Sequence, residues 1–289
     1  MNCNVSYWDR MSTREIRKAR EYNCSIIIPL GVIEAHGPLL PTGLDAMLAR
    51  VVAHLTAERM AAADAYSIVF DCIPYSGIVG ATDDLLGTIS FPAAQSTNML
   101  FIAIQKLYEQ GFRTFFLVNG DAGTGKCLIP FLFRTSTERQ DFFRAWKGTL
   151  ALFTWFEGIE QVGHASIVEH AVYTYLCQLA DEHTREVAAS AGIITPLKQQ
   201  DLRVLDGTQR VYPKPRREIF SWAKLPGQSE CEGVSSFSFS AYQEMIDSGK
   251  IISIWETQLK RITEHMLQIL GVQEENVHEL YYPQSARVR

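Results

Sequence analysis

One short stretch of the sequence, residues 31–45 (GVIEAHGPLLPTGLD), concentrates side chains that bind metal ions. Glu34 and His36 are two positions apart, so in an extended chain their side chains point the same way. A Gly-Pro pair then favours a turn, and Asp45 follows at the start of a predicted helix. One imidazole with two carboxylates suits Zn²⁺, Mn²⁺ or Fe²⁺ better than Ca²⁺. The alternative is that Glu34 and His36 are exposed loop residues and Asp45 only caps the helix.

The elements around this segment predict where those side chains lie. Apolar runs that read as strands occupy residues 24–30, 66–73, 113–119 and 148–155. Helical patterns cover residues 44–55, 93–110, 165–180 and 252–269. Strands that are apolar throughout and alternate with helices predict a mostly parallel sheet covered on both faces. We therefore expect one α/β domain over residues 1–289, a three-layer α/β/α sandwich, with loops and a short hairpin from 186–250 over one edge.

Polar residues follow two of these predicted strands at the point where each strand ends. Glu34 and His36 come after the strand at 24–30, and Asp121 comes after the strand at 113–119. In open parallel sheets, ligands bind outside the carboxyl ends of the strands. Separate strand ends therefore bring polar groups to the same edge of the sheet.

Residues 31–45 resemble the signature of the creatininase family, which runs roughly G-[S/T]-x-E-Q-H-G-P-H-L-P-L-x-T-D. The residues kept in register are Gly31, Glu34, His36, Gly37, Pro38, Leu40, Pro41 and Asp45. Weaker matches follow in the family's order at 87–90 (GTIS), 118–120 (VNG), 163–169 (GHASIVE) and 233–252. The resemblance covers about residues 20–270, and its first motif is the most specific.

The resemblance implies a three-layer α/β/α sandwich, often assembled as a homohexamer, and a metal centre in which Asp45 bridges two divalent ions. Glu34 and His36 would be further ligands. Members of the family hydrolyse cyclic amides such as creatinine, deformylate a pyrimidine intermediate, or open a cyclic inositol-derived ketone. We therefore expect a metal-dependent amidohydrolase that acts on a cyclic amide or related C–N bond of a small molecule. Zinc, manganese or iron ions, one or two per chain, and a homo-oligomer belong to this prediction.

The chain departs from the family pattern at several of these positions. Asp121 stands in place of the family's metal-binding His after V-N-G, and we predict that it is a ligand. Leu39 and Ala35 replace a His and a Gln of the signature, and Gly123 stands where creatininase has a further Glu. These changes predict a substrate other than creatinine. They also leave open an inactive relative that binds a ligand or a partner.

Glu169 and His164 are the predicted proton carriers. His164 matches the family's His before Ala-Gly and lies near the start of a predicted helix; its alternative role is to hydrogen-bond the helix end. Glu169 either replaces the missing ligand or acts as the acid and base. His170 is predicted to be a packed helix residue. Trp155 or Phe156 either stacks on a flat substrate ring or packs in the core.

Residues 120–127 (GDAGTGKC) also fit the phosphate-binding pattern G-x-x-x-x-G-K after a strand. The Ser or Thr that would hold Mg²⁺ in such a loop is replaced by Cys127. We find no convincing acidic partner on a second strand. Nucleotide binding is therefore the less favoured alternative.

Composition excludes other classes of function. The chain has 289 residues, 47% of them hydrophobic, and a net charge of −5, so neither nucleic acid nor an anionic membrane is an expected partner. No apolar stretch reaches the roughly 18 to 20 residues of a membrane span. The N-terminus lacks the pattern of a secretion signal, and we expect a cytoplasmic protein. The six cysteines are scattered, which favours free thiols over disulfides.

Overall fold

The computed structural model describes residues 5–76, 82, 85–124, 132, 137–159, 163–207, 234 and 237–272. Five parallel strands form one sheet in the order β1-β3-β2-β4-β5. The strands are β1 (Ser6–Tyr7), β2 (Ser25–Leu30), β3 (Ser67–Val69), β4 (Thr114–Asn119) and β5 (Thr149–Thr154). The predicted parallel sheet is confirmed, and β1 is an addition that the sequence patterns did not indicate.

The two faces of the sheet bury alternate side chains of the same strands. In β2, Ile26 and Ile28 belong to one hydrophobic cluster, whereas Ile27 belongs to the other. In β4, Phe115 and Phe116 divide in the same way. Because successive side chains of a strand point to opposite faces, a strand that is apolar at every position needs helices on both sides.

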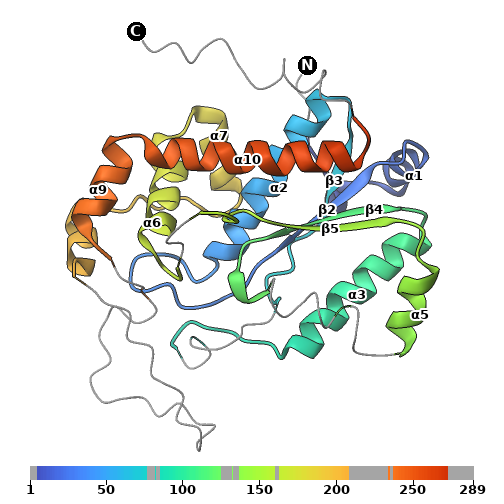
Figure 1. Ribbon diagram of the computed structural model, residues 1–289, viewed down its shortest axis with the longest axis horizontal. Coiled ribbons are helices and arrows are strands. Elements are labelled where there is room, and N and C mark those ends of the chain that lie inside the picture. Colours follow the sequence, from blue (N-terminus) through green and yellow to red (C-terminus); the bar gives the residue numbers. More distant parts are fainter. Residues whose placement is uncertain are drawn as a thin grey trace, which may run out of the picture.

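Helices cover both faces, which makes the expected three layers (Figure 1). One face carries α1 (Thr13–Glu21), α3 (Ala93–Glu109) and α5 (Thr137–Ala145). The other carries α2 (Leu44–Ala62), α6 (Ile167–Thr174), α7 (Glu182–Ser190), α9 (Phe239–Asp247) and α10 (Lys250–Ile269). Shorter helical segments are η1 (Trp8–Arg10), η2 (Tyr175–Leu179), α8 (Gln199–Leu202) and η3 (Arg203–Leu205).

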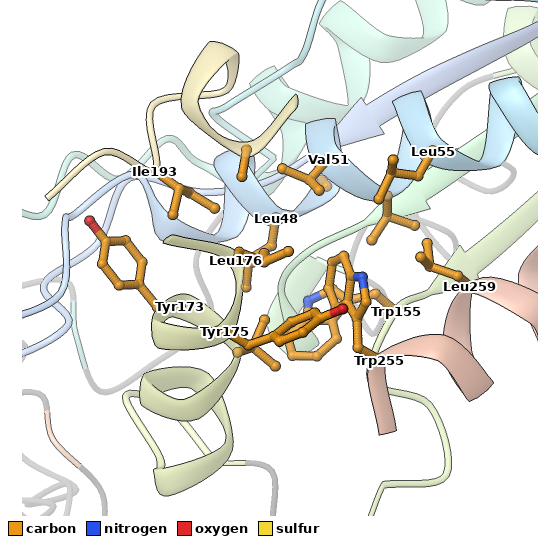
Figure 2. Packing of buried hydrophobic residues seen from close by; sticks show 14 of the residues in the cluster. Leu48, Val51, Leu55, Trp155, Tyr173, Tyr175, Leu176, Ile193, Trp255 and Leu259 are labelled. Carbon is orange, nitrogen blue, oxygen red and sulfur yellow. The ribbon is translucent and has the colours of Figure 1, made fainter. Parts of the chain in front are cut away.

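The larger core lies between the sheet and the helices that include α2 and α10 (Figure 2). Trp155, just after β5, and Trp255 of α10 have ring centroids 6.2 Å apart, and both side chains are buried. Leu48 of α2 and Leu259 of α10 belong to the same cluster. The core-packing alternative for Trp155 is therefore confirmed, because no face of its ring is open to a ligand.

The predicted strand at 66–73 is interrupted by a β-bulge. Regular pairing with β2 ends at Val69, which lies opposite Ile27, and resumes where Ile73 pairs with Leu30. Three residues of one strand therefore lie opposite two of the other, which bends the chain at this point.

The segment 186–250 also differs from its prediction. Its described residues include the expected loops, at 191–198 for example, but also the helices α7, α8, η3 and α9, and they contain no strand. Asp181 and Ser238 accept hydrogen bonds from backbone N–H groups at the starts of α7 and α9, a capping signal that the loop prediction overlooked. The predicted hairpin could fall only on residues 208–233, outside the described residues.

The remaining expectations concern membranes and thiols. Over the ranges that the structure describes, no helix combines the length and apolar character needed to cross a membrane. Cys24, Cys72 and Cys177 are free cysteines, as predicted for these three.

Candidate metal centre

Two glycines let the first turn of α2 lie directly against the ends of the central strands. A Cβ atom at Gly31, after β2, would lie 2.4 Å from the backbone nitrogen of Ala46. A Cβ atom at Gly120, after β4, would lie 2.1 Å from the backbone oxygen of Asp45. Any side chain at either position would displace the helix. This close approach buries Asp45 at the carboxyl end of the sheet.

The loop after β2 is tied down so that Glu34 and His36 face inward. The N–H of Ala35 donates to the hydroxyl of Thr88 (2.9 Å), in the segment 87–90 that resembled a family motif. The exposed fraction is 5% for Glu34 and 0% for His36, so the exposed-loop alternative is wrong. Gly43, and not Asp45, occupies the cap of α2, so the capping alternative is wrong as well.

Side chains close enough to hold a metal ion form three overlapping groups at this edge of the described sheet. The groups are Glu34, Asp45 and Asp121; His36, Asp45 and Glu169; and Glu34, His36 and His164. Within each group the potential ligand atoms lie within 4.8 Å of one another. The structure thus brings together the six site residues that the sequence predicted, from four separate segments of the chain.

The neighbours of His36 determine where its ring carries hydrogen. Its Nδ1 lies 3.0 Å from the backbone oxygen of Glu34, which can only accept, so Nδ1 carries the proton. Burial lowers the pKa of His36 and favours the neutral ring. Its Nε2 therefore presents a lone pair 3.3 Å from Oδ1 of Asp45. A lone pair facing a carboxylate is repulsive unless a proton or a metal ion lies between them.

Unpaired polar atoms of His36 and Asp45 also indicate that an ion binds between these two residues. Nε2 of His36 and Oδ2 of Asp45 are buried without hydrogen-bond partners. Buried polar atoms of native proteins are almost always paired, and unpaired ones call for an explanation such as an ion. The donor set, one imidazole nitrogen with several carboxylate oxygens, fits a divalent metal ion.

His164 is in the opposite protonation state. Its Nε2 lies 2.5 Å from the backbone oxygen of Ala35 and its Nδ1 lies 3.0 Å from Oε1 of Glu34, and both partners accept. Burial opposes the charge, but the bond and charge of Glu34 raise the pKa of His164 to about 9. The same ion pair, against burial, lowers the pKa of Glu34 to about 2. Both ring nitrogens of His164 thus face acceptors, so its ring offers no lone pair to a metal ion, whereas Glu34 and His36 of the same group remain potential ligands.

The other carboxylates of the site are crowded. Burial raises the pKa of Asp45 well above its usual range and raises that of Asp121 and Glu169, and the charge of Glu34 adds to the shift in each case. Four carboxyl groups thus share one buried region with one imidazolium. A divalent cation would offset this excess of negative charge.

Asp121 points into the site from the turn after β4. Its Oδ2 accepts the backbone N–H of Thr124 (2.6 Å). The side-chain amide of Asn119 bonds to both the backbone N–H and the backbone oxygen of Asp121. The carboxylate thus accepts a hydrogen bond from a backbone N–H group that a phosphate-binding loop would offer to its ligand. Lys126 and Cys127 of the nucleotide-binding pattern lie outside the described residues.

Glu169 and His170 lie at the start of α6. Oε2 of Glu169 accepts the N–H of Ser166 (3.1 Å) in a capping box, which holds the carboxylate beside His36. His170 donates from Nδ1 to the oxygen of Ser166 (2.9 Å) and packs edge-on against Phe237. Burial lowers the pKa of His170 to about 4. It is a packed residue, as predicted.

Three residues that shape the site were missed from the sequence. Thr82 donates its hydroxyl to Oε2 of Glu34 (2.6 Å) and carried no recognisable signal. Thr88 lies in the GTIS match, which gave no indication of its contact with the loop after β2. The role of Ser166 could have been predicted, because a Ser followed three residues later by a Glu, here Glu169, is the sequence pattern of a capping box.

Comparisons with known proteins agree with this architecture. The family model described as creatininase, creatinine amidohydrolase, matches residues 9–215. A 3-dehydro-scyllo-inosose hydrolase of Thermotoga maritima is 31% identical over 114 residues, which span 39% of this chain and 35% of that protein. The chain thus matches only about a third of that relative's length.

Solved structures show the same fold. A manganese creatininase superposes with a TM-score of 0.67 at 15% identity. A point variant of creatininase in a zinc–zinc form superposes with a TM-score of 0.65 at 16% identity. Each match covers 92% of this chain and 98% of the other.

Proposed function

The chain belongs to the creatininase family, and from this premise we propose that it is a metal-dependent hydrolase of a cyclic amide or related C–N bond in a small molecule. The observation that carries the proposal is the lone pair of His36 facing the carboxylate of Asp45 at 3.3 Å. A metal-free relative would have to relieve this repulsion by binding protons in the buried site, whereas a divalent ion offsets the charge of the carboxylates around it.

Two of the ligand groups would hold the ions. Glu34, Asp45 and Asp121 offer only oxygen atoms, which suit a harder ion such as Mn²⁺. His36, Asp45 and Glu169 add a nitrogen, which suits Zn²⁺ or Fe²⁺. Asp45 belongs to both groups and would bridge them. When bound, such ions lower the pKa of a water molecule and polarise a substrate carbonyl.

His164 would supply the proton for the leaving group. Its Nδ1–H is held by Glu34, whose charge keeps the ring protonated, so its Nε2–H would have to exchange the bond to the backbone oxygen of Ala35 for one to the leaving nitrogen. A proton donor must lie within hydrogen-bond reach of the leaving nitrogen, and protonation lets that nitrogen depart as a neutral amine. Glu169 is less suited to this role, because it belongs to the ligand group of His36 and Asp45.

The relative from Thermotoga maritima favours a second candidate, a cyclic ketone derived from inositol. A ring carbonyl is common to both substrate classes. They differ in the bond that breaks, C–N in the amide and C–C in the ketone. Leu39 and Ala35 replace a His and a Gln of the family signature and so remove two polar side chains from this segment, which supports a substrate other than creatinine.

The test combines metal analysis with a substrate panel. Purified protein is expected to contain one or two ions per chain and to hydrolyse members of one ring class when Mn²⁺ or Zn²⁺ is supplied. His36→Ala should lose metal and at least about 100-fold in kcat/KM. His265→Ala removes an exposed imidazole on α10 and should match wild type. A chain that purifies without metal, and gains no activity with either ion, would instead be an inactive binding protein.

A further inference from the structure

A second cluster of potential metal ligands lies farther along α2. His54 and Glu58 are one helical turn apart, and His183 belongs to the first turn of α7. Oε1 of Glu58 lies 3.2 Å from Nε2 of His54, and Oε2 lies 2.8 Å from Nε2 of His183. At 1.5 Å per residue, this cluster lies roughly 14 Å along the helix from Asp45. It is separate from the site described above.

A hydrogen bond already orients His54 as a metal ligand. The hydroxyl of Tyr7 lies 2.6 Å from its Nδ1. Histidines that bind metals almost always donate the hydrogen of their other ring nitrogen to a fixed acceptor, which leaves a lone pair on the ligating nitrogen. In the tautomer whose Nδ1–H donates to Tyr7, the lone pair of His54 is on Nε2, the atom that faces Glu58. Tyr7 comes from β1, so three elements build the cluster.

The cluster has the composition and access of a zinc site. Two imidazoles and one carboxylate, with ligand atoms within 4.8 Å of one another, are a set that Zn²⁺ takes together with a water molecule. The side chain of His183 is 58% exposed and that of Glu58 is 23% exposed, so an ion and a water can reach them.

We propose that His54, Glu58 and His183 bind one transition-metal ion, with Zn²⁺ as the preferred ion. The ion would lie between Glu58 and the two imidazoles, and its binding would release any hydrogen shared there. Because its ligands come from α2 and α7, it would clamp these helices together. The clamp is independent of the reaction proposed for the first site.

Zinc counting tests this site without any activity assay. Full-length protein stripped with a chelator is dialysed against Zn²⁺, and bound zinc per chain is measured by mass spectrometry. His183→Ala is expected to bind one ion fewer than wild type, and Zn²⁺ should raise its Tm by less. His265→Ala is the matched control and should bind as many ions as wild type.

The same comparison in a His36→Ala background separates the two sites. His183→Ala should remove one ion there too, whether or not the first site holds metal. Equal zinc content in His183→Ala and wild type, in both backgrounds, would overturn the proposal. A His183→Gln variant, whose amide can still bond to Glu58, should lose the ion as well; retention of the ion would show that His183 is not a ligand.

Discussion

Nδ1 of His164 lies 3.0 Å from Oε1 of Glu34. This ion pair joins the segment after β5 to the loop after β2, two parts of the site that are distant in sequence. Thr82 and the backbone oxygen of Ala35 complete the bonding of the two side chains. The pair is a local source of positive charge among carboxylates, so its titration affects the stability of the metal-free protein.

The metal-free protein is expected to lose stability as the pH rises from about 6.5 to about 9. The folded state raises the pKa of His164 from 6.5 to about 9, so the stabilisation is complete below pH 6.5 and is lost as the pH passes through 9. Thermal unfolding in the presence of a chelator measures the effect. His164→Gln should flatten this part of the profile, whereas His265→Gln should follow wild type. A wild-type Tm that stays constant across this range would contradict the assignment.

Asp45→Asn should stabilise the metal-free protein while removing its capacity to bind metal. The carboxyl group is buried among other carboxyl groups, which raise its pKa, and a neutral amide avoids that repulsion. We expect a gain of about 1–3 kcal/mol in the free energy of unfolding with a chelator present. Denaturant titration measures it. Asp71 is exposed, so Asp71→Asn is the control and should change neither the free energy of unfolding nor the metal binding. A destabilised Asp45→Asn apoprotein would show that the carboxylate has a structural role of its own.

Asp121 is expected to determine which ion the all-oxygen group prefers. Asp121→His replaces a charged oxygen ligand with a neutral nitrogen, and should raise the ratio of bound Zn²⁺ to bound Mn²⁺ in competition. Asp121→Ala should lower the metal content by one ion per chain if two are bound. Competitive dialysis followed by mass spectrometry tests both variants. Unchanged ion ratios and metal content in both would mean that Asp121 does not ligate.

Gly120→Ala should both destabilise the protein and reduce metal binding. Its Cβ atom would lie 2.1 Å from the backbone oxygen of Asp45, so the first turn of α2 must move. Overpacking of this kind costs about 1–3 kcal/mol. Gly43→Ala is a matched control beside the same helix, where the added atom would contact its neighbours at 3.6 Å. Denaturant titration and metal counting on both variants are sufficient, and equal behaviour of the two would count against the close approach.

Local sequence patterns predicted a large part of the fold and of the candidate site. The apolar runs and helical periodicities predicted the parallel sheet and its three layers, because a strand that is buried on both faces must be apolar at every position. The spacing of Glu34, His36 and Asp45 predicted a metal site at a strand end. The place of Asp121 after a strand was readable as well, but its role as a ligand and the choice of Glu169 came from the family resemblance.

Tertiary structure decided what those residues are chemically. Two histidines of the same site have opposite protonation states, because burial and the charge of His164 lower the pKa of His36, whereas the bond and charge of Glu34 overcome burial and raise the pKa of His164. Such states depend on partners that are distant in sequence, and no local pattern encodes them. The same holds for His54, Glu58 and His183, which had no supporting motif. Their proximity arises only from the packing of α7 against α2, since His183 is separated from the other two by more than 120 residues of chain.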